Sequence, residues 1–192
     1  MDLILASNNK DKLREVKRIM EPLGFSVKSQ REAGIDLEAD ETGTTFAENS
    51  LIKAKALYDI VKCAVIADDS GLVVDALGGE PGVYSARYGG DGVDDVERCY
   101  LVINKLGNTP MEQRTARFVA VITYIDANGE VAQFEGKIEG KIGYERLGER
   151  GFGYDPIFLV GDRTLAEFTD DEKNAVSHRG NALRALKEYL GK

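Results

Sequence analysis

The segment Ala67-Asp68-Asp69-Ser70-Gly71-Leu72 most constrains how this chain can fold. It lies between two short apolar runs, residues 64–67 and 72–74, and β-branched runs of this kind are typical of buried strands. Adjacent carboxylates at the edge of a buried strand repel each other and lose hydration, so they need a divalent cation, a Lys or Arg, or a shared proton. The same Asp-Asp-Ser-Gly residues are also common in solvated hairpin turns. The local sequence leaves both interpretations open.

The composition is typical of a soluble globular protein, and we expect one domain spanning residues 1–192. No apolar run approaches the ~20 residues of a membrane span, which argues against a membrane protein. Residues 1–7 have no basic region and too short an apolar run for a signal peptide, so we expect a cytoplasmic location.

Charge and residue counts exclude several kinds of site. The net charge of −8 argues against nucleic acid as the main partner, although a local cationic cluster could still bind a phosphorylated small molecule. The single histidine, His178, excludes any metal site that needs two imidazoles. Cys63 and Cys99 lie far apart in apolar patterns, so we interpret both as reduced.

Hydrophobic periodicity predicts an α/β or α+β domain with a mixed sheet. Predicted strands cover residues 2–6, 25–29, 64–67, 115–126 and 130–137; predicted helices cover 13–23, 46–62, 94–106 and 169–190. Asn128-Gly129 separates two of the strands and is a strong hairpin signal, so we expect the sheet to be partly antiparallel. Residues 78–90 contain too many turn residues for a regular element and are expected to be a loop.

The first strand is followed by a Ser/Asn-rich turn and a helix, an arrangement that exposes backbone N–H groups suited to anions. Asn9 and Lys12 could add an amide and an ammonium group to this turn. The alternative is that the polar residues only cap the helix. The segment is not a P-loop, because the glycine-rich stretch and Gly-Lys-Ser/Thr are missing.

Residues 36–41 form an acidic segment that is either a solvated loop or the second half of a Mg²⁺ site with Asp68 and Asp69. Thr45 and Glu48 match a capping box, which predicts the start of a helix. Lys53 on this helix is an ordinary surface lysine unless the helix flanks the acidic strand.

Two C-terminal segments are candidates for binding a ligand. Two glycines flank Phe152 and would let the backbone approach a ligand while presenting an aromatic ring. The alternative is that the aromatic residues of this loop pack into the core. A second capping box, at Thr169 and Glu172, opens a helix that carries Lys173 and His178.

Taken in order, these segments resemble the inosine/xanthosine triphosphate pyrophosphatase family. The matching segments are Ser7-Asn8-Asn9-Lys10-Asp11-Lys12, Glu41-Thr42-Gly43-Thr44-Thr45-Phe46, Glu48-Asn49-Ser50 with Lys53-Ala54, Ala67-Asp68-Asp69-Ser70-Gly71-Leu72, Pro81-Gly82-Val83-Tyr84-Ser85-Ala86-Arg87-Tyr88, Gly151-Phe152-Gly153-Tyr154-Asp155-Pro156-Ile157-Phe158 and Ser177-His178-Arg179-Gly180. Each motif is weak alone, but the ordered set spans residues 7–180.

The resemblance implies two lobes around a nucleotide cleft, a homodimer, and Mg²⁺-dependent cleavage of ITP, dITP and XTP to monophosphate and pyrophosphate. Asp69 would act as general base or metal ligand, Asp40 or Glu41 would complete the metal site, and Asp68 could take one of the roles of Asp69. Lys53 would stabilise charge on the leaving pyrophosphate. The remaining residues implied to bind substrate are Ser7, Asn8, Asn9, Lys10, Asp11, Lys12, Ser70, Phe152, Gly153, Tyr154, Asp155, Lys173, His178 and Arg179.

In this scheme Phe152 stacks on the base, and Lys173, His178 or Arg179 donates to the keto oxygen that adenine lacks. Two alternatives remain. A related pyrophosphatase would act on modified pyrimidine nucleotides, against which Ser177-His178-Arg179-Gly180 argues. A non-catalytic nucleotide sensor would keep the lysines but would not need the carboxylate pair.

Overall fold

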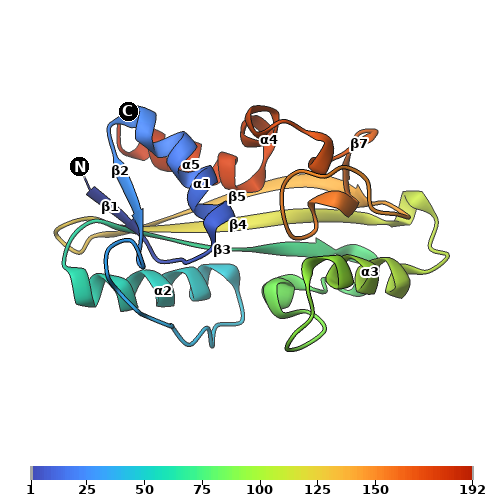
Figure 1. The fold of residues 1–192 in the computed structure, drawn as a ribbon, viewed down its shortest axis with the longest axis horizontal. Coiled ribbons are helices and arrows are strands. Elements are labelled where there is room, and N and C mark those ends of the chain that lie inside the picture. Colours follow the sequence, from blue (N-terminus) through green and yellow to red (C-terminus); the bar gives the residue numbers. More distant parts are fainter. Residues whose placement is uncertain (1, 192) are drawn as a thin grey trace. The chain divides into compact units, whose positions relative to one another are not determined.

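A computed structural model describes residues 2–191 and shows helices packed on a mixed β-sheet (Figure 1). The sheet has seven strands in the order β2-β1-β3-β4-β5-β6-β7. Strand β1 is parallel to β2 and β3, whereas β6 is antiparallel to β5 and β7. The predicted α/β fold with a partly antiparallel mixed sheet is confirmed.

The chain divides into two compact units, and β3, β4 and β5 contribute residues to both. The first unit comprises Met1–Ser70, Ala120–Gly136 and His178–Lys192; the second comprises Gly71–Val119 and Lys137–Ser177. None of the helices in the described part of the chain has the length and apolar character needed to span a bilayer. That the whole chain forms a single domain stays a prediction.

The first unit has helices on both faces of its strands (Figure 1). It contains β1 (Asp2–Leu5), α1 (Lys10–Met20), β2 (Ser26–Ser29), α2 (Phe46–Val61), α5 (His178–Tyr189), and parts of β3 (Val65–Val74), β4 (Thr115–Ile125) and β5 (Val131–Ile142). Helices α1 and α5 cover one face, and α2 covers the other. The predicted capping box at Thr45 in this unit is formed, and so is the predicted capping box at Thr169 in the second unit.

Strand β3 alternates between these two faces. Ala64, just before the strand, and Ile66 pack with residues of α1 and α5, whereas Val65 and Ala67 pack with residues of α2. Side chains of successive strand residues point to opposite faces of a sheet. Residues 68 and 70 therefore continue the α1/α5 face, and residue 69 continues the α2 face.

The second unit contains α3 (Asp95–Leu106), β6 (Phe158–Val160), β7 (Arg163–Thr164), α4 (Asp170–Val176) and the remaining parts of β3, β4 and β5. Its core joins Leu72 and Val74 of β3 to the apolar face of α3 and to Phe158. The predicted loop at residues 78–90 contains a short 3₁₀ helix, Gly82–Arg87, and residues 143–154 contain no helix or strand.

The predicted end of the third strand is wrong. Strand β3 does not end at Ala67 but continues through the Asp-Asp-Ser-Gly segment to Val74, so that segment is not a turn. The carboxylates are tolerated inside a strand because cations from neighbouring helices contact them, as shown below.

Two other element boundaries also differ from the sequence prediction. The predicted helix at 169–190 is two helices, because Ser177 has an extended backbone with ψ 156°. Strand β5 passes through Gly136 and continues past residue 137 through Gly140 to Ile142. A Cβ atom at Gly136 would lie 2.1 Å from the carbonyl oxygen of His178, so this glycine allows close packing and does not end the strand.

Candidate active site

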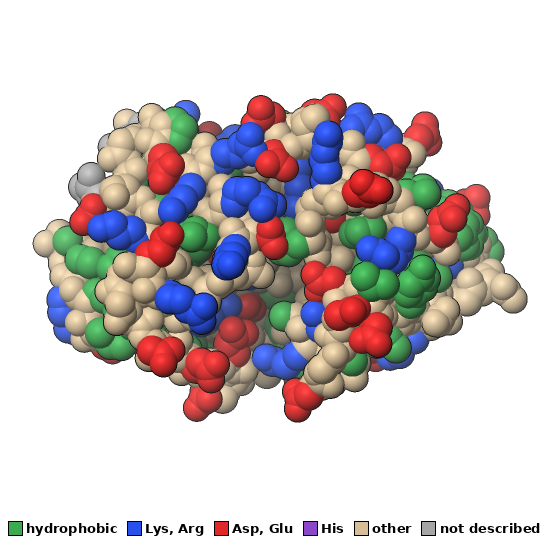
Figure 2. All heavy atoms as spheres, viewed as in Figure 1, with side chains coloured by type: hydrophobic (Ala, Val, Ile, Leu, Met, Phe, Trp, Pro, Cys, Tyr) green, Lys and Arg blue, Asp and Glu red, His purple; other side chains and the backbone are tan. Residues whose placement is uncertain are grey.

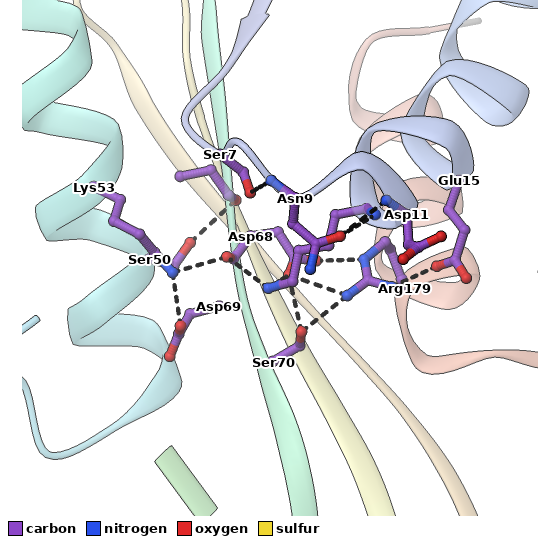
Figure 3. Close-up of polar contacts among 12 residues, drawn as sticks. Ser7, Asn9, Asp11, Glu15, Ser50, Lys53, Asp68, Asp69, Ser70 and Arg179 are labelled. Carbon is purple, nitrogen blue, oxygen red and sulfur yellow. Dashed lines mark hydrogen bonds and ion pairs between the residues drawn. The ribbon is translucent and has the colours of Figure 1, made fainter. Parts of the chain in front are cut away.

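Asp68 and Asp69 point to opposite faces of β3 (Figure 3). The Asp68 carboxylate contacts cations of α1 and α5, and the Asp69 carboxylate contacts a lysine of α2. Lys12 of α1 lies 2.6 Å from Asp68 Oδ1, and Lys53 of α2 lies 2.7 Å from Asp69 Oδ1. Both lysines also donate to the backbone carbonyl oxygen of Asp68, at 3.4 Å and 2.9 Å. The two ammonium groups thus meet at one peptide group of the strand.

Asp68 belongs to a buried ion network on the α1/α5 face. Arg179 Nε donates to Asp68 Oδ2 at 2.7 Å, its Nη2 donates to Ser70 Oγ at 2.9 Å, and its Nη1 donates to Glu15. Burial favours the neutral acid, but Arg179 and Lys12 outweigh it and hold the pKa of Asp68 well below its usual range. Burial also lowers the pKa of Lys12 despite the nearby Asp68 carboxylate. Asp68 is therefore an ionised structural centre.

Asp69 has a different environment on the α2 face. Among the described residues its Oδ2 atom is buried without a hydrogen-bond partner, while Oδ1 accepts from Lys53. Burial raises the pKa of Asp69, even though Lys53 favours the carboxylate. Burial opposes the charge on Lys53 as well, but Asp69 and Glu41 raise its pKa overall. Asp69 therefore presents one carboxylate oxygen that lacks a protein donor, as a proton acceptor or metal ligand would.

The acidic segment reaches this face through Glu41. The Glu41 carboxylate lies 3.2 Å from Lys53 Nζ, so the ammonium group bridges Glu41 and Asp69, whereas the side chain of Asp40 is exposed. Within residues 2–191 no group of three or more His, Cys, Asp or Glu side chains is already arranged to hold a metal ion. The oxygen donors nevertheless fit a hard cation, because Asp69 Oδ2 has no partner among the described residues and Glu41 contacts the same Lys53 ammonium group as Asp69.

Helix α2 is fixed against the strands by buried polar contacts. Ser50 Oγ donates to the carbonyl oxygen of Ala67 at 3.2 Å and lies 2.8 Å from Thr123 Oγ1. The preceding residue, fully buried Asn49, accepts a hydrogen bond from Gly43 N through Oδ1 at 2.8 Å, which ties the end of the acidic segment to the helix. These contacts set the position of Lys53 relative to Asp69.

The Ser/Asn turn forms the start of α1 as predicted. Asn9 caps the helix, with Oδ1 accepting from the N–H groups of Asp11 and Lys12, and Ser7 Oγ accepts from Asn9 N (Figure 3). Asn8 and Lys10 are exposed, and Asp11 forms an exposed ion pair with Arg14. The polar residues of this turn therefore do cap the helix, and Lys12 nevertheless contacts Asp68.

The predicted base-binding residues of the second unit form their own cluster. Asp155 Oδ2 accepts from Phe152 N at 2.9 Å and from Lys173 Nζ at 2.6 Å, and Lys173 Nζ lies 4.6 Å from the Phe152 ring centroid. A Cβ atom at Gly151 would lie 2.1 Å from Asp155 Oδ2, so the loop needs glycine there. The hydroxyl group of Tyr154 donates to the carbonyl oxygen of Ser85 at 2.8 Å. Lys173 and Phe152 are thus brought together, as the sequence predicts.

The first unit holds the other predicted base readers. His178 is buried at the start of α5, and Arg179 is 1% exposed with its guanidinium contacting Asp68, Glu15 and Ser70. A role of Arg179 in binding the base stays a prediction, but these contacts favour a positioning role. Glu15 is a member of the network that the sequence patterns miss. The sequence feature that could have identified Glu15 is its position on α1, three residues after Lys12 and next to buried Val16.

Comparison with known proteins agrees with this arrangement of motifs. The model of the Ham1 family matches residues 3–189 of the chain. The chain belongs to the Ham1 family. A relative from Bacillus subtilis, named dITP/XTP pyrophosphatase, is 49% identical over 191 residues, which cover 98% of this chain and 96% of the relative.

Solved Ham1-family structures have the same fold. The Staphylococcus aureus Ham1 protein is 41% identical with a TM-score of 0.88, covering 100% of this chain and 98% of that one. A Mycobacterium abscessus protein described as a nucleoside-triphosphatase / dITP/XTP pyrophosphatase is 44% identical with a TM-score of 0.77, covering 97% and 98%. The likeness covers the chain from end to end.

Proposed function

We propose that this protein hydrolyses the non-standard purine nucleoside triphosphates ITP, dITP and XTP to monophosphate and pyrophosphate, in a Mg²⁺-dependent reaction. Membership of the Ham1 family and relatives named dITP/XTP pyrophosphatase support the proposal. The observation that carries it is the buried Oδ2 atom of Asp69, which has no donor among the described residues and lies on a carboxylate whose pKa is raised. Such a group is suited to accept a proton or ligate a metal.

In the proposed reaction a water oxygen bonds to the α-phosphorus, and the bond from that phosphorus to the bridging oxygen breaks. Asp69 accepts the proton of the attacking water, and pyrophosphate leaves with the bridging oxygen. Lys53 and Lys12 offset the negative charge that develops on the leaving group. Ser7, Asn9 and Ser70 provide further hydrogen-bonding groups for the phosphates.

Glu41 would hold Mg²⁺, with exposed Asp40 as its alternative, and Asp69 would be a ligand only in place of its role as base, because a metal-bound carboxylate is a poor proton acceptor. When bound, the cation would polarise phosphate oxygens and neutralise their charge. Lys53 would then exchange its contacts with these carboxylates for contacts with the triphosphate.

We assign the purine base to the second-unit cluster of Phe152, Asp155 and Lys173. The ring of Phe152 offers a stacking surface. A donor such as Lys173 favours the keto oxygen of hypoxanthine and xanthine, and the amino group of adenine would leave that donor unpaired. Unsatisfied polar groups of this kind can discriminate by roughly 10⁴-fold or more.

The location and partners of the protein are part of the same proposal. We expect a cytoplasmic homodimer whose partner is the nucleotide and not nucleic acid. Charged side chains of both signs are interspersed over the face shown in Figure 2, and the chain carries a net charge of −8. Phosphate backbones are instead bound by continuous basic surfaces.

A nucleotide panel tests the proposed function. The purified protein is incubated with Mg²⁺ and ITP, dITP, XTP, GTP, ATP or modified pyrimidine triphosphates, and pyrophosphate and free phosphate are assayed separately. We expect pyrophosphate from the keto purines ITP, dITP and XTP, and far less from ATP. Free phosphate from ATP without pyrophosphate, or no turnover of any keto purine, would contradict the proposal.

A further inference from the structure

Helix α3 holds Gly153 through both its N–H and its carbonyl group, which belong to successive peptide groups. Gly153 N donates to Asp95 Oδ2 at 2.9 Å, and the thiol of Cys99 donates to the carbonyl oxygen of Gly153 at 3.3 Å. Asp95 and Cys99 are four residues apart, so they lie on the same side of the helix. Burial raises the pKa of the Cys99 thiol to about 11, which keeps the donating proton in place.

This clamp acts on the loop that presents Phe152. Residues 143–154 contain no helix or strand, and their course is fixed by a few backbone hydrogen bonds, such as Arg150 N to the Ala166 oxygen, together with contacts from side chains to the backbone. Phe152 N is held by Asp155, and at the next residue Asp95 holds the N–H group and Cys99 holds the carbonyl oxygen. Gly153 itself has φ +59°, a conformation that costs a glycine little.

The two oxygen atoms of Asp95 have separate partners. Oδ1 pairs with Arg98 at 2.8 Å within the first turn of α3, and Oδ2 accepts from Gly153. An acid in the first turn of a helix needs no contact beyond the helix itself, because the helix dipole already favours it. The contact with Gly153, 58 residues away in the sequence, therefore serves the loop.

We propose that Asp95 is a positioning residue for purine recognition, which holds the Gly153 peptide so that the Phe152 ring and Lys173 keep the geometry that selects the base. This inference rests on the proposed function, since it assumes that Phe152 and Lys173 bind the base. Asp95 does not contact the reacting atoms. Its loss therefore affects base binding and selectivity more than the chemical step, and buried Cys99 holds the carbonyl group of the same residue.

Steady-state kinetics with Mg²⁺ test the inference in Asp95→Ala, with ITP and ATP as substrates. We expect KM for ITP to rise by roughly 3- to 10-fold, as the loss of one partly exposed charge-assisted hydrogen bond would give, with kcat changed less than about 2-fold. The ratio of kcat/KM for ITP to kcat/KM for ATP should fall as KM for ITP rises. Inhibition by inorganic pyrophosphate, which has no base, should keep its wild-type constant.

Matched variants separate the clamp from helix stability. Asp95→Asn keeps an acceptor oxygen and should restore most of the ITP preference, and Cys99→Ala should shift KM in the same direction as Asp95→Ala. Arg98→Ala removes the partner of Oδ1 and should leave the ratio unchanged. Hydrogen exchange should increase in the peptide spanning residues 148–155 in Asp95→Ala, and not in Arg98→Ala.

Two outcomes would overturn the inference. If wild-type protein prefers ITP but Asp95→Ala keeps both its KM and its ITP/ATP ratio, the proposed function stands and the positioning role of Asp95 is wrong. If Asp95→Ala and Arg98→Ala lose activity equally on all nucleotides, Asp95 only stabilises α3. No pyrophosphate release from any keto purine by the wild-type protein would instead refute the proposed function, and this inference with it.

Discussion

Asp68 and Asp69 are consecutive residues of β3, yet their carboxylates interact with different cations on opposite faces of the sheet. Asp68 binds Lys12 and Arg179, and every one of these side chains is mostly buried. Asp69 binds Lys53 through one oxygen and leaves the other without a donor among the described residues. The pair therefore divides into one residue that stabilises the fold and one that is available for chemistry.

Neutralising each carboxylate should separate these two roles. Asp69→Asn should lower kcat by roughly 10²- to 10⁴-fold, the usual contribution of a general base, without lowering the melting temperature. Asp68→Asn should lower the free energy of unfolding by about 3–5 kcal/mol, because Arg179 and Glu15 lose a buried partner of the network. Kinetics and urea denaturation of both variants check this. Full activity in Asp69→Asn would exclude this carboxylate as the catalytic centre.

The difference in unfolding free energy from the wild type should change with pH in one direction for Asp68→Asn and in the opposite direction for Asp69→Asn. The pKa of Asp68 is depressed in the folded state, so its stabilising contribution is present above the unfolded pKa of about 3.9 and is lost as pH falls through the folded value. The pKa of Asp69 is raised, so its contribution is present below about pH 3.9 and is lost as pH rises through the folded value.

Urea titrations in metal-free buffer between about pH 3 and 7 measure this, since the unfolded carboxyl groups titrate in that range. Asp68→Asn should be most destabilised near neutrality and approach the wild type in acid. Asp69→Asn should gain stability relative to the wild type as pH rises. Parallel curves for the two variants would contradict the assignment of opposite pKa shifts.

Metal binding should be detectable without turnover. Mg²⁺ should raise the melting temperature of the wild-type protein with a concentration dependence that follows mass action, about 2.7 kcal/mol of stabilisation at 100 times the dissociation constant. Asp69→Asn and Glu41→Gln should lose most of this rise, whereas Asp40→Asn tests the exposed alternative. A Mg²⁺-dependent rise that survives in Asp69→Asn would place the cation elsewhere.

Arg179 and Glu15 should behave as partners in one network. Glu15→Gln and Arg179→Lys should each destabilise the fold, and the double variant should cost less than the sum, because residues in one network couple by about 0.5–3 kcal/mol. Urea denaturation of the four proteins gives the coupling. A direct role of Arg179 in reading the base would instead appear as a selective loss of activity on inosine nucleotides, with little change in stability.

Local signals in the sequence predict much of this fold. The two capping boxes form at Thr45 and Thr169, and the strand-to-helix turn at Asn9 forms as predicted. These features depend on residues three or four apart. The local sequence leaves Lys53 as an ordinary surface lysine unless helix 46–62 flanks the acidic strand, and the structure shows that it does.

The features that the sequence does not predict depend on distant residues. Asp-Asp-Ser-Gly is typical of a turn, and it lies in a strand because Arg179, 111 residues away, contacts Asp68. In the sequence Gly140 resembles a strand breaker. In the structure a Cβ atom at this position would lie 2.7 Å from the Phe158 ring, so the glycine allows close packing. The clamp of Asp95 on Gly153 has no local signal, since its parts are 58 residues apart.

The alternation of β3 also limits which insertions and deletions this chain could tolerate during evolution. Removing one residue between Ala64 and Ala67 would exchange the faces of all later side chains, and both carboxylates would move to the wrong helix. Removing two residues would restore the faces but shift the carboxylates by about 7 Å along the strand, beyond the reach of Lys12 and Lys53. Length variation should therefore be confined to the loops, and the interval from Val65 to Ser70 should keep its length in any functional descendant.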